Sequence, residues 1–304
     1  MADRHAGARG SRYAGRSLRG TLMTQLEIRE EAIPVWNGRL KLHVQIAGEG
    51  PPLLYFHPAP GFHWDPFLES LAAERTVYAP LAPGTAPGDP HAISEVDDVW
   101  DLVLVYEEAL RALGLSRPAA VGASFGGMLA CELAAHFPGI FSHLVLLDPI
   151  GLWRDDLPVR NAFMLSHEKQ AELIFFDPQG EVARAMMTPP QDPAEAAAAI
   201  ASTVWALGCT SKFFWPIPDK GLSKRIHRIE TPTLIVWGKQ DGLVPAGYAE
   251  EFAKRISGSR VELIDECGHV PQAEQAEKTL ALVQDFLSVP GGSRREAAAS
   301  SASA

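Results

Sequence analysis

Cysteine is scarce in this 304-residue chain, and no stretch approaches the run of about 20 apolar residues that a membrane-spanning helix needs. The three cysteines, Cys131, Cys209 and Cys267, form no C-x-x-C pair, and no H-E-x-x-H motif accompanies them. The sequence therefore predicts neither a disulfide framework nor a zinc site, and we expect no metal and no membrane partner. Reduced thiols fit a cytoplasmic protein best.

Positive charge is also in deficit, because 37 acidic residues outnumber 27 basic ones and the formal net charge is −10. An acidic body offers no electrostatic footprint for nucleic acid, so none is expected as a partner. The basic residues are concentrated at the start, where residues 1–20 hold five arginines and one acidic residue.

The two ends of the chain are rich in Gly, Ser and Ala. Residues 1–24 lack the apolar segment of a secretory signal, and we interpret them as a disordered, Arg-rich extension. A targeting peptide or a tail for anionic surfaces is the alternative. Residues 290–304 are expected to form a disordered tail.

Between these ends, short apolar runs alternate with helical patterns. The runs lack a polar/apolar alternation, as expected for strands that are buried on both faces of a parallel sheet. A hairpin around Asn37-Gly38 precedes them. The pattern predicts an α/β fold with a mostly parallel sheet and helices on both faces. The runs cover residues 52–57, 76–80, 119–122, 143–148, 233–237 and 261–265, and the helices residues 95–113, 125–136, 246–256 and 272–287.

Residues 150–228 interrupt this alternation. They are helical in propensity and dense in aromatic residues, which either line a substrate pocket or pack the interior of the segment itself. Ligands in open α/β sheets bind at the carboxyl ends of the strands, the edge that this segment leaves and rejoins. We therefore interpret it as a helical cap on a core made of residues 25–149 and 229–289.

The motif Gly122-Ala-Ser124-Phe-Gly126 lies between a strand-like run and a helix-like run. A sharp turn there would lift the Ser124 side chain above the sheet, and both glycines are needed because Cβ atoms would collide with the neighbouring strand and helix. The helix that starts after Ser124 points free N–H groups at the reacting centre. This context predicts that Ser124 is a nucleophile.

A serine nucleophile needs a histidine base and an acid that orients it. His269 follows the last strand-like run, so it lies at the same edge of the sheet as Ser124. Two acids end strands at that edge, Asp241 and Asp148, and the chain order permits either. Asp241 is favoured, because the glycines of its short polar loop let a carboxylate approach an imidazole.

Together these motifs resemble the α/β-hydrolase superfamily from about residue 40 to residue 287, in its serine-nucleophile, cap-bearing branch of esterases and C–C hydrolases. The resemblance implies a mostly parallel eight-stranded sheet and a cap. It also implies an oxyanion hole of two backbone N–H groups, those of Phe125 and Ala59. Members usually show His-Gly before the donor, whereas this chain has His57-Pro58-Ala59-Pro60, in which neither proline can donate.

These features predict a Ser-His-Asp hydrolase that cleaves a small, mostly apolar ester through an acyl-enzyme, with no metal or organic cofactor. The alternatives are a C–C bond hydrolase of ring-cleavage products, a lactonase or a perhydrolase, and a hormone-receptor-like binding protein on the same fold. C–C hydrolases commonly place Trp after the catalytic histidine, where this chain has Val270. We expect a monomer or a homodimer. The predicted pocket residues are His57, Trp153, Phe176, Trp215 and Val270.

Overall fold

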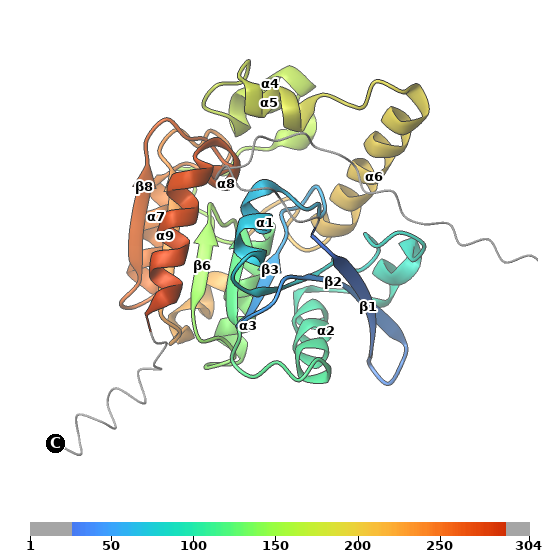
Figure 1. Ribbon diagram of the computed structural model, residues 1–304. Helices are drawn as coiled ribbons and strands as arrows, with labels where there is room; N and C mark the ends of the chain where they lie inside the picture. Colours follow the sequence, from blue (N-terminus) through green and yellow to red (C-terminus); the bar gives the residue numbers. More distant parts are fainter. Residues whose placement is uncertain (1–25, 290–304) are drawn as a thin grey trace, which may run out of the picture.

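Figure 1 shows the computed structural model, in which residues 26–289 are described. The strands form one sheet in the order β1-β2-β4-β3-β5-β6-β7-β8. Strands β1, β2 and β4 pair antiparallel, and all other neighbours pair parallel. The prediction of an eight-stranded, mostly parallel sheet is confirmed. The predicted extension at 1–24 and the predicted tail at 290–304 lie outside the described residues.

The strands are β1 (Ile28–Val35), β2 (Leu40–Ala47), β3 (Pro52–Phe56), β4 (Thr76–Pro80), β5 (Ala119–Ala123), β6 (Leu144–Leu147), β7 (Thr233–Gly238) and β8 (Arg260–Ile264). The α-helices are α1 (Pro66–Ala72), α2 (Val99–Ala112), α3 (Phe125–His136), α4 (His167–Ile174), α5 (Glu181–Met187), α6 (Pro193–Ser211), α7 (Gly247–Arg255), α8 (Pro271–Glu274) and α9 (Ala276–Ser288). Short 3₁₀ turns are η1 (Pro90–Glu95), η2 (Ala162–Met164), η3 (Leu222–Lys224) and η4 (Ile226–Arg228).

The central strands β5, β6 and β7 are buried along their whole length, which is why their sequences are apolar without alternation. The β1–β2 hairpin turns where it was predicted. Asn37 and Gly38 both have positive φ, and the N–H of Arg39 donates to the carbonyl of Trp36 (3.2 Å), as in a type I′ turn.

Helices cover both faces of the sheet. Apolar side chains of α2, α3 and α7 pack on one face, and those of α1 and α9 pack on the other. The helix predicted over residues 95–113, for which Ser94 is the expected cap, starts later, at Val99, because residues 90–95 form the separate turn η1. The carboxylate of Asp98 accepts from the N–H groups of Trp100 and Asp101 and so caps α2 at its true start, while Ser94 bonds within η1.

The segment of residues 150–228 lies between β6 and β7 and contains α4, α5 and α6. Figure 1 shows α4 and α5 beyond the upper edge of the sheet, toward which β6 points, and α6 at the upper right. We call residues 150–228 the inserted segment. Its role as a separate cap domain stays a prediction.

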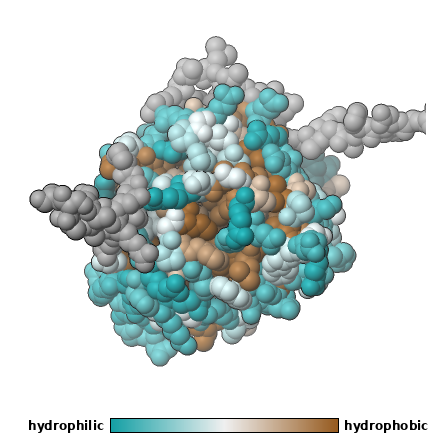
Figure 2. Space-filling model, turned by 90° about the horizontal axis from the view of Figure 1, so that it is seen from below, coloured by the Kyte–Doolittle hydropathy of each residue, from teal (hydrophilic) through white to brown (hydrophobic). Residues whose placement is uncertain are grey.

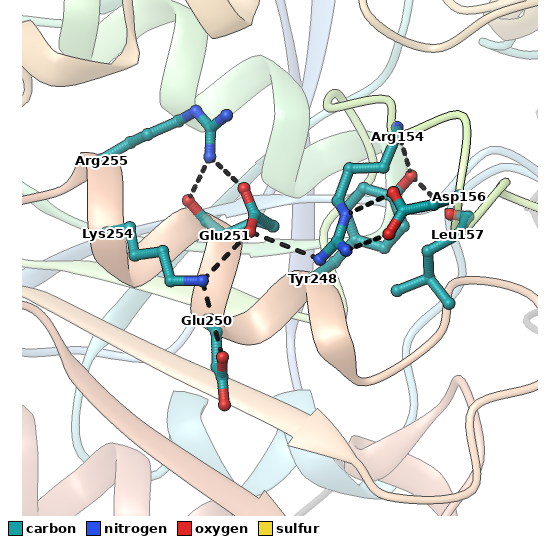
Figure 3. A network of polar contacts seen from close by, with 8 residues as sticks. All are labelled: Arg154, Asp156, Leu157, Tyr248, Glu250, Glu251, Lys254 and Arg255. Carbon is teal, nitrogen blue, oxygen red and sulfur yellow. Dashed lines mark hydrogen bonds and ion pairs between the residues drawn. The ribbon is translucent and has the colours of Figure 1, made fainter.

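The start of the inserted segment is attached to α7 by the polar network in Figure 3. The hydroxyl of Tyr248 donates to the carbonyl of Leu157 and accepts from the N–H of Arg154, both at 2.8 Å. The guanidinium of Arg154 forms ion pairs with Asp156 and, at 3.4 Å, with Glu251. These contacts fix where the segment leaves the sheet.

The opposite edge of the sheet, where the parallel strands begin, faces the viewer in Figure 2. Hydrophobic residues gather in the middle of this face within a hydrophilic surround. Within residues 26–289, no helix combines the length and the apolar character needed to cross a membrane. Cys131, Cys209 and Cys267 are all buried free thiols.

Candidate active site

Ser124 lies on a sharp turn between β5 and α3, and its φ of +51° is in the left-handed region that L-residues rarely adopt. The turn is held on both sides. The Ser124 N–H donates to the carbonyl of Leu147 on β6 (2.9 Å), and the Ser124 carbonyl accepts from Gly127 (3.0 Å) and Met128 (3.2 Å). A strained serine that remains partly exposed at a strand-to-helix turn has the backbone geometry expected of a nucleophile elbow.

The two motif glycines are required by close backbone contacts. A Cβ on Gly122 would lie 2.5 Å from the carbonyl oxygen of Gly126 on α3, and one on Gly126 would lie 2.0 Å from the carbonyl oxygen of Phe56 on β3. Larger residues would push helix and strand apart and move Ser124. As the sequence predicts, a Cβ at these two glycines would collide with the neighbouring helix and strand.

His269 connects Ser124 to Asp241. Its Nε2 lies 2.9 Å from the Oγ of Ser124, and its Nδ1 lies 2.7 Å from Oδ2 of Asp241. Because an ionised carboxylate can only accept, Nδ1 carries the proton and Nε2 is free to accept one from the serine hydroxyl. Both His269 and Asp241 are buried, so little water competes for these hydrogen bonds.

Of the two candidate acids, Asp241 is the one that contacts His269. Its other oxygen, Oδ1, accepts from the N–H groups of Leu243 (2.9 Å) and Val244 (2.8 Å), which orient the carboxylate. Asp148 follows β6 directly and makes no hydrogen bond to His269 among the described residues. Its carboxylate accepts from the N–H of Gly238 (3.0 Å).

The C-terminus of α4 is hydrogen-bonded to the loop that bears Asp241 and to the loop that bears His269. The carbonyl of Leu173 accepts from the N–H of Gly242 (3.0 Å), and the carbonyl of Ile174 accepts from the N–H of His269 (2.7 Å). The last carbonyls of a helix have no partner within the helix and are available for such contacts. They also carry the negative end of the helix dipole, which favours a positive charge on the imidazole.

Glu274 on α8 makes a second contact between the histidine loop and the inserted segment. Its carboxylate accepts from the N–H groups of Gly268 (2.6 Å) and Phe176 (2.8 Å), and burial raises its pKa. Sequence reasoning missed Glu274, because a glutamate in a first helical turn gives no sign that its partners lie outside the helix.

The loop after β3 orients the second predicted oxyanion donor. The carbonyl of Pro58 accepts from Nδ1 of His57 (2.7 Å) and from the N–H of Gly61 (3.2 Å). In a trans peptide the N–H points away from the carbonyl of the same plane, so holding the Pro58 carbonyl also fixes the direction of the Ala59 N–H. Nε2 of His57 accepts from the N–H of Ala82 (3.0 Å), and burial lowers the pKa of His57 to about 4, so the ring is neutral.

Helix α6 contacts the same loop from the inserted segment. The hydroxyl of Thr210, which is fully buried, lies 3.0 Å from the carbonyl oxygen of Ala59, and the indole N–H of Trp205 donates to the carbonyl of Gly84 (2.9 Å). A Cβ on Gly61 would lie 3.3 Å from the side chain of Ala206. The inserted segment therefore contacts the loops that bear Ala59, Asp241 and His269.

A family model described as "alpha/beta hydrolase fold" matches residues 51–276, which include all the loops described above. The chain belongs to the alpha/beta hydrolase family. Among curated relatives, the monoacylglycerol lipase ABHD6 of Bos taurus is 30% identical over 185 residues, which cover 55% of this chain and 53% of that protein. This chain spans about half the length, or less, of the monoacylglycerol lipases that it matches.

A second relative matches over more of its length. The 2-hydroxy-6-oxo-6-phenylhexa-2,4-dienoate hydrolase of Comamonas testosteroni is 24% identical over 270 residues, covering 81% of this chain and 91% of that protein. Among solved structures, the hydrolase of the same name from Rhodococcus sp. strain RHA1 is similar with a TM-score of 0.65. It is 22% identical and covers 87% of this chain and 100% of that chain, a likeness that supports the fold.

The five predicted pocket residues of this alpha/beta hydrolase have different surroundings. The ring nitrogens of His57 are engaged by the backbone, and the indole N–H of Trp153 donates to Asp155 two residues away (2.8 Å). Val270 is buried in a small cluster with residues of α4 and α5. Phe176 and Trp215 are 46% and 39% exposed. Their role in binding substrate stays a prediction.

A row of aromatic rings extends from the turn after Ser124 to the surface of the inserted segment. The ring centroid of Phe125 lies 5.7 Å from that of Phe214, which lies 6.1 Å from Phe163, which in turn lies 5.2 Å from Trp215. The ring of Phe213 also stacks on that of Phe125, with their centroids 6.3 Å apart and an angle of 22° between the ring planes. Of these, only Trp215 was predicted as a pocket residue. Phe125 was predicted only as an oxyanion donor, and Phe163, Phe213 and Phe214 stood out only as members of a dense aromatic set.

Asp148, Asp241 and His269 also have the side-chain types of a metal site, and their ligand atoms lie within 4.8 Å of one another. The ring of His269 and the carboxylate of Asp241 are already engaged in hydrogen bonds, so they are better suited to sharing protons than to binding a metal ion. Nδ1 of His269 lies at hydrogen-bond distance from Asp241, and Oδ1 of Asp241 already accepts from two N–H groups. The expectation that this chain needs no metal stays a prediction.

Proposed function

We propose that this protein is a serine hydrolase that cleaves a small, mostly apolar carboxylic ester. The observation that carries the proposal is the continuous hydrogen-bonded row Ser124–His269–Asp241, with distances of 2.9 and 2.7 Å, at a strained turn next to the first N–H groups of α3. Nucleophile, base and orienting acid stand in the order that acyl transfer requires.

The reaction would proceed in two steps. In the first, the Oγ of Ser124 attacks the ester carbonyl carbon while Nε2 of His269 takes the hydroxyl proton, which then passes to the departing alcohol. In the second, water gives a proton to His269 and attacks the acyl-enzyme, and Ser124 leaves with that proton. The N–H groups of Phe125 and Ala59 would stabilise the oxyanion in both steps, each contributing about 2.7–4 kcal/mol to lowering the barrier.

Two observations support an apolar ester as the substrate. The relative from Bos taurus is named a monoacylglycerol lipase, and a monoacylglycerol is an ester with an apolar chain. The aromatic row starts at the buried Phe125, beside the nucleophile, and ends at Phe163 and Trp215, which are 42% and 39% exposed. These two rings offer apolar surface, whose burial is favourable by about 25 cal/mol per Å² removed from water. No metal or organic cofactor is needed for this chemistry.

A C–C bond hydrolase is the second candidate, because the relative that matches over 81% of this chain bears the name of such an enzyme. Val270, in place of the tryptophan expected there, favours the ester. A lactonase, a perhydrolase and a hormone-receptor-like binding protein complete the alternatives. We further propose a cytoplasmic monomer or homodimer, on the ground that all three thiols are free and buried.

A panel of purified substrates tests the proposal. Short-chain and medium-chain p-nitrophenyl esters, a monoacylglycerol, a lactone and a 2-hydroxy-6-oxo-dienoate are offered to the wild type and to Ser124→Ala. The proposal predicts the highest kcat/KM on the esters and a loss of at least about 10³-fold in the variant. Faster turnover of the dienoate would favour the second candidate, and tight binding without turnover would favour a receptor.

A further inference from the structure

Asp148 is a fully buried carboxyl group next to the proposed catalytic acid. It follows β6 directly with a φ of +43°, and its Oδ1 accepts from the N–H of Gly238 (3.0 Å). Its Oδ2 is buried, and within residues 26–289 no N–H or O–H group donates to it. A buried charged oxygen without a donor is costly, so this oxygen needs an explanation.

The neighbour of Asp148 is Asp241, and an oxygen of one carboxyl group lies within 4.8 Å of an oxygen of the other. Two adjacent buried carboxylates repel each other, so one of them holds a proton. Asp241 receives hydrogen bonds from Leu243, Val244 and His269, all of which stabilise its charged form, whereas Asp148 receives one, from Gly238. The proton therefore belongs on Asp148.

We propose that Asp148 is a neutral carboxylic acid whose Oδ2–H donates to the carboxylate of Asp241 and thereby positions it against His269. Asp148 is a positioning residue, because it acts on the triad through Asp241. A neutral donor serves better than an ionised one, since a second negative charge would push the Asp241 carboxylate away from its place beside the imidazole.

The surrounding groups agree with this assignment. Burial raises the pKa of Asp148 well above its usual range, and the charges of Asp241 and of Glu274 on α8 raise it further. Cys267, in the histidine loop, also faces this pair, and burial raises its pKa well above the usual range of a thiol, so the thiol is neutral. His269 is the remaining titratable neighbour, and its Nδ1 is hydrogen-bonded to Asp241 (2.7 Å).

Amide and alkyl substitutions separate a neutral donor from an ionised acid. In Asp148→Asn, the amide oxygen can accept from Gly238 and the amide NH₂ can donate to Asp241, so the hydrogen-bond pattern of the neutral acid is retained. We expect kcat within about threefold of the wild type for Asp148→Asn, and a kcat about 10- to 100-fold lower with little change in KM for Asp148→Ala.

The pH profile gives a readout that a merely structural role would not change. In the wild type, kcat/KM falls at high pH when Asp148 ionises, whereas in Asp148→Asn this alkaline decrease moves to higher pH because the amide cannot ionise. Thermal unfolding of each variant confirms that it is folded. An Asp148→Asn variant that is folded but as slow as Asp148→Ala, or slower than Asp241→Asn, would overturn the proposal.

The kinetic experiments rest on the proposed function, so a second experiment tests the protonation of Asp148 without measuring activity. Infrared spectroscopy of the whole protein at pH 8 detects the C=O stretch of a protonated carboxyl group. The proposal predicts such a band in the wild type and in Ser124→Ala, and its loss in Asp148→Asn. A band that persists in Asp148→Asn, or none in the wild type, would overturn the assignment whether or not the protein is an esterase.

Discussion

The hydroxyl of Thr210 in α6 lies 3.0 Å from the carbonyl oxygen of Ala59, which joins the inserted segment to the loop of the proposed oxyanion donor. The hydroxyl proton is shared with the carbonyl of Ala206 in the same helix, at 2.9 Å. In Thr210→Val the Ala59 carbonyl loses this shared donor, at a cost of about 1–3 kcal/mol, and the loop can shift to find another. We expect kcat to fall roughly tenfold while KM changes little, because an oxyanion donor acts in the transition state.

Thr210→Ser is the matched control, because it retains the hydroxyl and loses only a methyl group. Steady-state kinetics on one p-nitrophenyl ester compare the two variants. Equal kcat values for Thr210→Val and Thr210→Ser would show that this hydrogen bond does not support the oxyanion loop.

Asp241→Asn is expected to lower kcat by a factor on the order of 10⁴, as the equivalent change does in serine proteases. An amide NH₂ facing His269 would favour the imidazole tautomer that leaves Nε2 protonated and unable to accept from Ser124. Asp265→Asn is the control, since this exposed aspartate follows β8 and forms an ion pair with Lys239 at 2.6 Å. Comparable losses in both variants would place the acid elsewhere.

The aromatic row predicts selection by apolar burial. Across a series of p-nitrophenyl esters, kcat/KM should rise with alkyl length until the available surface is covered. Phe163→Ala and Trp215→Ala should flatten this rise, because their rings end the row at the surface of the inserted segment. Trp100→Ala removes an equally exposed tryptophan on α2, next to His136, and should leave the slope unchanged. A flat wild-type series would contradict this account.

His57 makes folding stability depend on pH. The unfolded ring takes up a proton near pH 6.5 and the folded ring only near pH 4, because burial lowers its pKa. Between these values the unfolded state binds one more proton, so acidification destabilises the fold, by about 3 kcal/mol in total. Above pH 6.5 this contribution is fully present.

Urea unfolding of the wild type and of His57→Gln at pH 7 and pH 4 measures the effect. Asp65, whose pKa is raised to about 6 by burial, changes stability in the opposite direction, but it does so in both proteins and cancels in the comparison. The wild type should lose about 3 kcal/mol more than the variant on going from pH 7 to pH 4. An equal loss would mean that the buried ring takes up a proton at its ordinary pKa.

Much of the fold could be predicted from the sequence, because strands buried on both faces carry continuous apolar runs. The helix after Ser124 was predicted with its true ends, Phe125 and His136, since a strand-turn-helix motif fixes its start. The helix predicted from residue 95 starts later, at Val99, because Ser94 and Asp98 are both good N-cap residues and only the folded chain selects one. The last helix is interrupted at Gln275, between α8 and α9.

The candidate site was predicted less completely. Ser124, His269 and Asp241 stand out because each follows a strand at one edge of the sheet. The inserted segment makes its contacts through a hydroxyl and backbone carbonyls, such as those of Thr210 and of α4, and these contacts join residues far apart in the chain. Such groups occur throughout any sequence, so no local pattern predicts which of them will meet. The same holds for the ion pair of the half-buried Arg225, which lies between η3 and η4, with the buried Glu132 of α3.

Covalent labelling tests the central claim, that Ser124 is an activated nucleophile, most directly. The wild type, Ser124→Ala and His269→Ala are treated with a fluorophosphonate, digested and mapped by mass spectrometry. The account predicts one modified residue, Ser124, in the wild type, slow labelling in His269→Ala and none in Ser124→Ala. Labelling at another residue, or equal labelling of wild type and Ser124→Ala, would contradict it.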